Sequence, residues 1–144
     1  MTGWRLAGDS CGTTRVLNLT GEWRDKLATA VERMVFRTYP SSSESMRFAE
    51  AALVRYSVNA TVPPHTDINP SKRRRALSFV CYLTDGYLGG ELVIPGLNHH
   101  GIGQRGSLIT FPSTELHWAT QVTAGDKSVF VGFLESMGML DNDN

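Results

Sequence analysis

Two residues that could bind a metal ion stand two positions apart in the segment Val62-Pro63-Pro64-His65-Thr66-Asp67. The two prolines disfavour a helix, so the segment is expected to be extended. In an extended strand, residues i and i+2 point to the same side. His65 and Asp67 would therefore present an imidazole and a carboxylate to one point. A bare His-x-Asp also occurs by chance as two surface residues, so the rest of the chain must decide.

One further histidine would give two imidazoles and one carboxylate. This set is the facial triad that holds iron(II) in non-haem oxygenases and leaves coordination positions open. The candidates are His99, His100 and His117. His99 and His100 lie in a glycine-flanked loop that is expected to face solvent or a rim, whereas His117 is expected to open a strand. This placement favours His117, and the other two remain alternatives.

Lys127 follows His117 by ten residues and opens the next expected strand after a tight turn. Two antiparallel strands joined in this way can bring both side chains to the same interior. Lys127, Val129, Val131 and Phe133 share one face by period two. A lysine on an apolar inward face needs an anionic partner, because an unpaired buried charge is costly. The alternative is a lysine at the start of a strand, exposed to water.

The elements that must position these residues begin with a helix. Thr20 can cap it, and Pro40 should end it. The residues on its apolar face should pack against a sheet, and they are Trp23, Leu27, Val31, Met34 and Val35.

From Met46 onward the hydrophobic pattern changes to a period of two. Glycine and proline mark the junctions between short strands, which is typical of a sandwich or barrel. The expected strands are 49–58, 76–83, 91–94, 107–111, 117–122 and 127–134.

Composition narrows the range of partners. The chain has 144 residues, which predicts one domain, and its 14 basic residues balance 14 acidic ones. No overall charge therefore favours nucleic acid, and no segment approaches the length of a membrane span. Cys11 and Cys81 are far apart and no export signal is evident, so we expect free thiols and a cytoplasmic location.

The ordered set of these motifs resembles the catalytic core of the prolyl-4-hydroxylase-like iron(II)/2-oxoglutarate dioxygenases. The bacterial PKHD-type hydroxylases are the most similar in style. The likeness covers roughly residues 53–136, and its elements are His65-Thr66-Asp67, Ser78 to Leu83, Gly89-Gly90-Glu91-Leu92-Val93-Ile94, Phe111-Pro112-Ser113, His117 and Lys127.

The resemblance implies a mainly β fold, a double-stranded β-helix or jelly roll with the N-terminal helix packed outside the sheet. It implies a single dioxygenase domain with a helical segment (1–47), a catalytic core (48–136) and a tail (137–144). By the same resemblance, His65, Asp67 and His117 correspond to the iron(II) ligands, with 2-oxoglutarate and O2 as cosubstrates. The expected tail, Asp141 to Asn144, is polar and solvated.

The resemblance also suggests how 2-oxoglutarate is held. Lys127 resembles the cation that pairs with its distal carboxylate, and Tyr82 resembles the strand tyrosine that hydrogen-bonds the same group. Ser78 and Val80 share the face of Tyr82 and would line the cosubstrate. Tyr56 resembles a tyrosine of the pocket wall.

The implied reaction is hydroxylation of an unactivated C–H bond, with succinate and carbon dioxide as products. The substrate would be an amino-acid-like small molecule or a peptide-linked side chain. Period two carries the Tyr82 face back to Arg74, which is therefore the expected substrate anchor. If the strand starts later, Arg73 or Arg75 would take this role instead. Phe133 is expected to line the substrate pocket. Trp118 alternates to the other side of its strand and is expected in the core.

Two alternatives remain open at this stage. A nucleic-acid or protein demethylase of the same superfamily is one, although nothing basic follows Lys127 and the net charge is zero. A non-enzymatic jelly roll that binds a metal or small ligand is the other, and it would be expected to lack part of the ligand set or the lysine. The sequence leaves the oligomeric state open.

Overall fold

The computed structural model describes residues 5–6, 13–40 and 45–137. One helix and twelve strands lie within these ranges, with the short 3-10 helix η2 (Pro95–Leu97). They are β1 (Arg5–Leu6), β2 (Thr14–Asn18), α1 (Gly21–Thr38), β3 (Met46–Tyr56), β4 (Val62–His65), β5 (Arg75–Tyr82), β6 (Leu88–Gly89), β7 (Leu92–Ile94), β8 (His99–Gly101), β9 (Leu108–Pro112), β10 (His117–Ala119), β11 (Val122–Ala124) and β12 (Lys127–Ser136).

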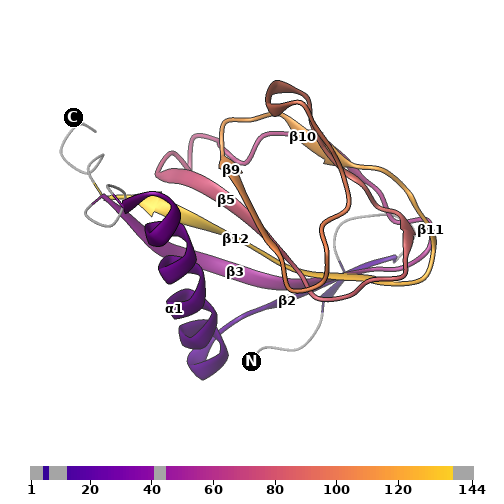
Figure 1. The fold of residues 1–144 in the computed structure, drawn as a ribbon, viewed down its shortest axis with the longest axis horizontal. Coiled ribbons are helices and arrows are strands. Elements are labelled where there is room, and N and C mark those ends of the chain that lie inside the picture. Colours follow the sequence, from indigo (N-terminus) through magenta and orange to yellow (C-terminus); the bar gives the residue numbers. More distant parts are fainter. Residues whose placement is uncertain (1–4, 7–12, 41–44, 138–144) are drawn as a thin grey trace.

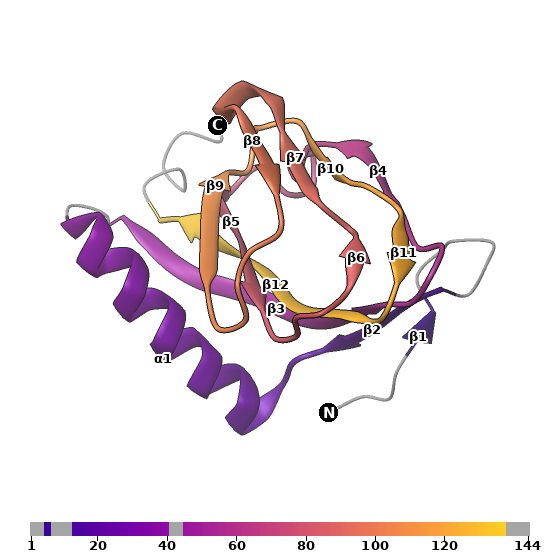
Figure 2. The same ribbon diagram turned by 45° about the vertical axis from the view of Figure 1, so that its right-hand side comes forward.

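Two antiparallel sheets enclose the interior of the fold (Figures 1 and 2). The larger has the order β1-β2-β3-β12-β5-β9, the smaller has the order β4-β10-β7-β8, and β11 pairs with β6. Leu92 and Ile94 of the smaller sheet pack on Phe111 of the larger one, so apolar side chains fill the space between them. This arrangement confirms the expected mainly β jelly roll.

Helix α1 covers the outer face of the larger sheet, as expected (Figure 1). Val31 and Val35 are buried against Phe48, Phe79 and Leu134 in one apolar cluster. Burial of these side chains fixes the helix to β3, β5 and β12, and leaves the inner face of the sheet for the cavity described below.

Two residues of the apolar face predicted for the helix are exposed, so the prediction is wrong at these positions. Trp23 is 59% exposed and Met34 is 48% exposed. At 3.6 residues per turn, Trp23 and Met34 lie about 80° and about 60° from Val31 around the helix axis, on one flank of the buried face. Arg24 covers the core instead, with its guanidinium 5.1 Å from the centroid of the Phe48 ring.

The helix and strand boundaries are close to those expected, with three differences. The segment 117–122 forms two strands, β10 and β11, which belong to different sheets. His99 and His100 lie on strand β8, paired with Ile94 and Val93, and not in a loop. Thr20 precedes α1 in an extended conformation but makes no side-chain cap hydrogen bond.

Strand β12 is the central element for the site. It pairs with β3 on one side, where Lys127 lies opposite Tyr56, and with β5 on the other, where Phe133 lies opposite Ser78. Cross-strand partners point to the same face of a sheet. The residues that the sequence pattern assigned to an inward face are therefore gathered on one surface.

None of the described residues forms a helix long and apolar enough to cross a membrane. Cys81 is a half-buried free thiol. Cys11 and the tail Asp141 to Asn144 lie outside the described residues.

Candidate active site

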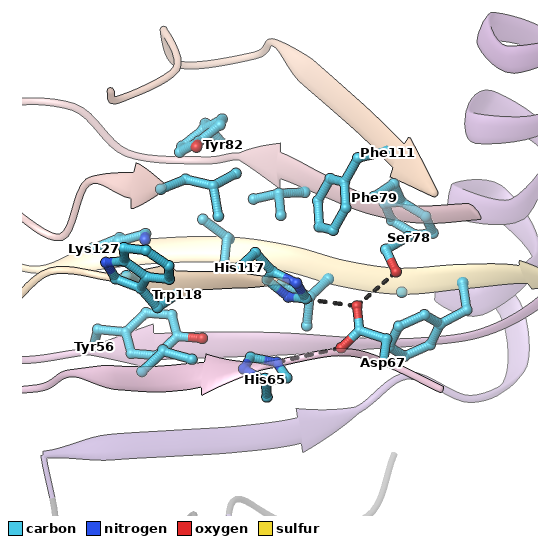
Figure 3. Close-up of a pocket in the computed structure, with 18 residues that line it drawn as sticks. Tyr56, His65, Asp67, Ser78, Phe79, Tyr82, Phe111, His117, Trp118 and Lys127 are labelled. Carbon is cyan, nitrogen blue, oxygen red and sulfur yellow. Dashed lines mark hydrogen bonds and ion pairs between the residues drawn. The ribbon is translucent and has the colours of Figure 1, made fainter. Parts of the chain in front are cut away.

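His65 and His117 face each other across two paired strands. They are direct cross-strand partners in the β4–β10 pair, and their ring centroids are 4.2 Å apart. Asp67 lies two residues beyond His65, with Oδ1 3.3 Å from Nε2 of His65 and Oδ2 3.5 Å from Nε2 of His117. The three potential ligand atoms lie within 4.8 Å of one another (Figure 3).

Backbone carbonyls orient both imidazoles. Nδ1 of His65 lies 2.8 Å from the carbonyl oxygen of Pro63, and Nδ1 of His117 lies 3.0 Å from that of Glu115. A carbonyl oxygen only accepts hydrogen bonds, so each Nδ1 must carry the proton and donate. In the neutral ring, Nε2 then offers its lone pair toward Asp67, which is the arrangement of a metal-binding histidine.

The electrostatics of the cluster favour a carboxylate anion. Burial raises the pKa of Asp67, but hydrogen bonds from His65 and Ser78 and the charge of His117 outweigh it, so the pKa lies below its ordinary value. The hydrogen bond with Asp67 is the main cause that raises the pKa of His65, against the opposing effect of burial. In the metal-free protein a proton on Nε2 of His65 makes the hydrogen bond to Asp67, and a bound metal ion would take the place of this proton. Two imidazoles and one carboxylate therefore fit iron(II).

A cavity of about 230 Å³ extends from this cluster between the sheets. In Figure 3, Asp67 and Ser78 lie toward one end of the group and Lys127 toward the other. The lining includes every side chain that the sequence placed in the cosubstrate pocket, namely Tyr56, Ser78, Val80, Tyr82 and Lys127. It also includes Phe133, which was expected in the substrate pocket.

Lys127 is 5% exposed and carries the ammonium group of the cavity. Its Nζ donates a hydrogen bond of 2.9 Å to the carbonyl oxygen of Gly90 and lies 5.1 Å from the centroid of the Tyr56 ring. Burial lowers the pKa of Lys127 to about 8, and no carboxylate of the described residues forms an ion pair with it. A buried ammonium without a counter-charge fits an anionic ligand.

Gly90 has a backbone role at this end of the cavity. Its φ of +63° is in the left-handed region, which glycine adopts most readily. A Cβ at this position would lie 3.2 Å from Cδ of Lys127. Gly90 thus allows the lysine to approach the main chain.

Two tyrosines also border the cavity. Tyr82 is 1% exposed and its hydroxyl has no hydrogen-bond partner of normal geometry. Burial raises the pKa of Tyr82, with a smaller opposite effect from the backbone of Gly103. Burial also raises the pKa of Tyr56, to about 12. The Tyr82 hydroxyl and the Lys127 ammonium line the same cavity, and together they fit a carboxylate ligand.

Contacts that sequence reasoning missed lie beneath the metal ligands. Ser78, expected to line the cosubstrate, hydrogen-bonds Asp67 and Ser113 as well. Phe111 packs against His117 at 4.8 Å between ring centroids. The Phe111-Pro112-Ser113 motif in the sequence pointed to these residues. A motif alone does not reveal which of the three candidate ligands each of its members contacts.

The position of Arg74 differs from the expected one. Arg74 lies in the turn before β5, is exposed, and borders a separate depression with Lys72, Arg73 and Glu135. The register of β5 against β12 shifts at this point, because Leu134 pairs with Leu77 and Glu135 pairs with Arg75. A bulged residue reverses the alternation of side chains. Arg75 therefore takes the inward position that simple alternation assigned to Arg74.

Arg75 lies at the edge of a second, open cavity of about 850 Å³. Its guanidinium carbon stacks 3.5 Å from the centroid of the Phe133 ring, and Nη2 donates to Glu50 at 2.5 Å. Nη1 donates to the backbone carbonyl of Asp67 at 3.1 Å. We call this second cavity the open groove, and the cavity beside the His–Asp–His cluster the metal-proximal cavity. The two are contiguous, because both are lined by Tyr56, Val62, Val131 and Phe133.

The remaining candidates lie elsewhere. His100 is exposed and hydrogen-bonds Glu91, and neither His99 nor His100 belongs to the metal-ligand cluster found among the described residues. Trp118, expected in the core, is half-buried and borders the metal-proximal cavity. The small bulge between β4 and β10 disturbs strict alternation there.

Comparison with known proteins agrees with this geometry. The sequence model described as the 2OG-Fe(II) oxygenase superfamily matches residues 51–135. A PKHD-type hydroxylase from Parvibaculum lavamentivorans is 29% identical over 122 residues, which make up 77% of this chain and 54% of that protein. A PKHD-type hydroxylase from Prochlorococcus marinus is 43% identical over 70 residues, or 46% of this chain and 32% of that protein.

Solved structures show the same fold. The viral collagen prolyl hydroxylase from Paramecium Bursaria Chlorella virus-1 aligns with a TM-score of 0.68 at 18% identity, over 87% of this chain and 80% of that one. The chain spans about a third to a half of the length of the two curated relatives. The family's sequence model nevertheless covers more than half of the chain, and the chain therefore belongs to the 2OG-Fe(II) oxygenase superfamily.

Proposed function

We propose that this chain is an iron(II)- and 2-oxoglutarate-dependent dioxygenase that hydroxylates an unactivated C–H bond. One observation carries the proposal: a His–Asp–His cluster and a buried, unpaired lysine share one cavity. A ligand with a chelating group at one end and a carboxylate at the other would satisfy both. 2-Oxoglutarate has this chemistry, and the family name supports it.

The roles of the residues follow from their positions. His65, Asp67 and His117 would hold iron(II), and Lys127 with Tyr82 would receive the distal carboxylate of 2-oxoglutarate. When bound, iron and 2-oxoglutarate together supply the oxidising chemistry, with dioxygen consumed and succinate and carbon dioxide released. The apolar walls between these groups, Val80, Leu92, Val129 and Val131, would exclude water from the centre.

The substrate would enter through the open groove. Its floor is mostly apolar, with Val16, Ala52, Val54 and Val131 among the lining residues, and it reaches the cavity at Phe133. An amino-acid-like small molecule or a peptide-linked side chain fits such a groove. The relative that is named a collagen prolyl hydroxylase supports the peptide-linked form.

Arg75 is the proposed substrate anchor, in the place first expected for Arg74. Its guanidinium borders the open groove, where the positive charge would attract a substrate carboxylate. Stacking on Phe133 and the hydrogen bond to Glu50 hold the group in place. A lysine could not reproduce this planar, stacked arrangement.

The division into a helical segment (1–47), a catalytic core (48–136) and a tail (137–144) is part of the same proposal.

The test of the proposed function is a substrate search by mass spectrometry, in which candidate amino acids and peptides are incubated with the protein, iron(II), 2-oxoglutarate and isotopically labelled dioxygen. The expected product gains one labelled oxygen atom. Turnover of 2-oxoglutarate with no oxygen incorporated into any amino acid or peptide would contradict the proposed substrate class.

A further inference from the structure

Two buried serine hydroxyls lie beneath the Asp67 carboxylate. Ser78 on β5 is 2% exposed and Ser113, which directly follows β9, is 0% exposed. The two strands are paired, with Ser78 opposite Phe111, so their backbones bring the hydroxyls together. Figure 3 shows Ser78 directed at Asp67. Buried hydroxyls are costly unless they are hydrogen-bonded, which makes the direction of their bonds informative.

The hydrogen bonds run in one direction. Oγ of Ser78 donates to Oδ2 of Asp67 at 2.6 Å and lies 2.9 Å from Oγ of Ser113. A serine hydroxyl has one hydrogen to donate, and Ser78 uses it on the carboxylate. Ser113 must therefore donate to Ser78, and the chain of bonds runs from Ser113 through Ser78 to Asp67.

The turn that contains Ser113, directly after β9, also holds the backbone of Asp67. The Asp67 amide donates to the carbonyl oxygen of Ser113 at 3.0 Å, and the Ser113 amide donates to that of Ala76 at 3.0 Å. Ser113 thus contacts the main chain of Asp67 directly and its side chain through Ser78. The carboxylate is held in place before any metal ion arrives.

We propose that Ser113 and Ser78 form a hydroxyl relay that positions Asp67 for the metal ion and keeps one of its oxygens engaged. This inference rests on the proposed function. Among the described residues, no hydroxyl hydrogen-bonds Oδ1, which faces the candidate ligand atom Nε2 of His65 at 3.3 Å, so this oxygen is left for the metal. A carboxylate that binds through one oxygen leaves more coordination positions for cosubstrate and oxygen than one that chelates through both. Ser78 and Ser113 are positioning residues, since they act through Asp67.

The test uses cobalt(II) as a probe of the metal-free protein. Its affinity is measured by calorimetry and its coordination by visible absorption in the native protein, Ser78→Ala, Ser113→Ala and the double variant. Ser107→Ala is the control, because within the described part of the chain the hydroxyl that it removes bonds the carbonyl of Gln104 alone. Thermal unfolding of each metal-free variant separates loss of stability from loss of the relay.

Ser78→Ala is expected to weaken cobalt(II) binding about ten- to a hundredfold and to alter the visible spectrum. Ser113→Ala should have a smaller effect in the same direction, and this effect should disappear in the Ser78→Ala background, because Ser113 acts through Ser78. Binding and a spectrum unchanged in Ser78→Ala, as in the control, would overturn the relay alone. Additive effects of the two variants would also overturn it. Absence of cobalt(II) binding by the native protein would overturn the proposed metal site and the relay with it.

Discussion

Nζ of Lys127 lies 2.9 Å from the carbonyl oxygen of Gly90, and this neutral acceptor is the hydrogen-bond partner that the structure gives the buried ammonium. A carbonyl dipole does not neutralise a positive charge. The lysine therefore carries an unsatisfied charge at one end of the cavity. Its contribution to the free energy of unfolding should differ between the free and the ligand-bound protein.

Lys127→Met should make the free protein more stable and weaken 2-oxoglutarate binding. The variant replaces a desolvated charge with an apolar side chain of similar length. Loss of a charge-assisted hydrogen bond corresponds to about 1.5–3 kcal/mol, or roughly a tenfold to more than hundredfold weaker binding of 2-oxoglutarate. Thermal unfolding with and without 2-oxoglutarate measures both effects. Lys26→Met, at an exposed lysine of α1, is the control and should change neither.

Binding of 2-oxoglutarate should take up a proton above pH 8. The pKa of Lys127 in the free protein is about 8, and a bound carboxylate would raise it. The affinity should therefore fall as pH rises above 8. Calorimetry in buffers of different ionisation enthalpy measures the proton uptake, and Lys127→Arg should abolish it because arginine stays charged. Uptake that persists in Lys127→Arg would assign the proton to another group.

The same pKa sets the sign of a stability effect in the free protein. The folded-state value lies below the ordinary 10.5, so the unfolded chain holds the proton more tightly between pH 8 and 10.5. The contribution of Lys127 to the free energy of unfolding should therefore increase as pH rises through this window. Comparing urea unfolding of the native protein and Lys127→Met across the window isolates this contribution.

Removal of either histidine ligand should abolish metal binding. His65→Ala and His117→Ala each leave one imidazole and one carboxylate, which is too few donors to hold iron(II). His100→Ala is the matched control, since His100 bonds Glu91 and lies outside the cluster. Metal content after dialysis measures the outcome, and full occupancy in His117→Ala would refute the assignment of the ligands.

Arg75→Ala should weaken turnover of the substrate about ten- to a hundredfold, because a charge-assisted hydrogen bond is lost. Slow conversion of 2-oxoglutarate without substrate should persist. Arg74→Ala, one residue away in the exposed turn, should behave like the native protein. Steady-state kinetics on the substrate found by the screen decides between them, and an equal loss in both variants would argue against a specific anchor.

Val35→Ala should destabilise the protein by about 2 kcal/mol, since it removes buried methyl groups from the cluster under α1. Met34→Ala on the exposed flank should change the free energy of unfolding by less than about 0.5 kcal/mol. Urea unfolding of the two variants provides the comparison. A larger effect at Met34 would mean that another surface covers this flank.

The sequence alone was sufficient to predict that His65, Asp67 and His117 lie together, and to predict much of the fold. His65 and Asp67 share a side because extended chains alternate, and the inward face of Lys127 and Phe133 follows from the same rule. That rule fails where a strand is bulged. One extra residue in β5 opposite Glu135 turns Arg75 inward in place of Arg74, and local sequence does not mark such a bulge.

Contacts between residues far apart in the chain could not be predicted from the sequence either. The bond between Ser78 and Ser113 joins residues 35 positions apart, and it depends on the pairing of β5 with β9. Val35 and Met34 lie about 100° apart around the helix axis. Both fit the apolar pattern, which does not decide that Val35 is buried and Met34 exposed.

The most direct test of the proposed activity is iron-dependent formation of succinate. The purified native protein is incubated in air with 2-oxoglutarate and iron(II), and succinate is quantified by mass spectrometry beside Lys127→Met and His117→Ala. The proposal predicts succinate from the native protein, none above background from His117→Ala, and recovery in Lys127→Met only at greatly raised 2-oxoglutarate. Succinate formation that is equal in all three proteins, or absent from the metal-loaded native protein, would contradict it.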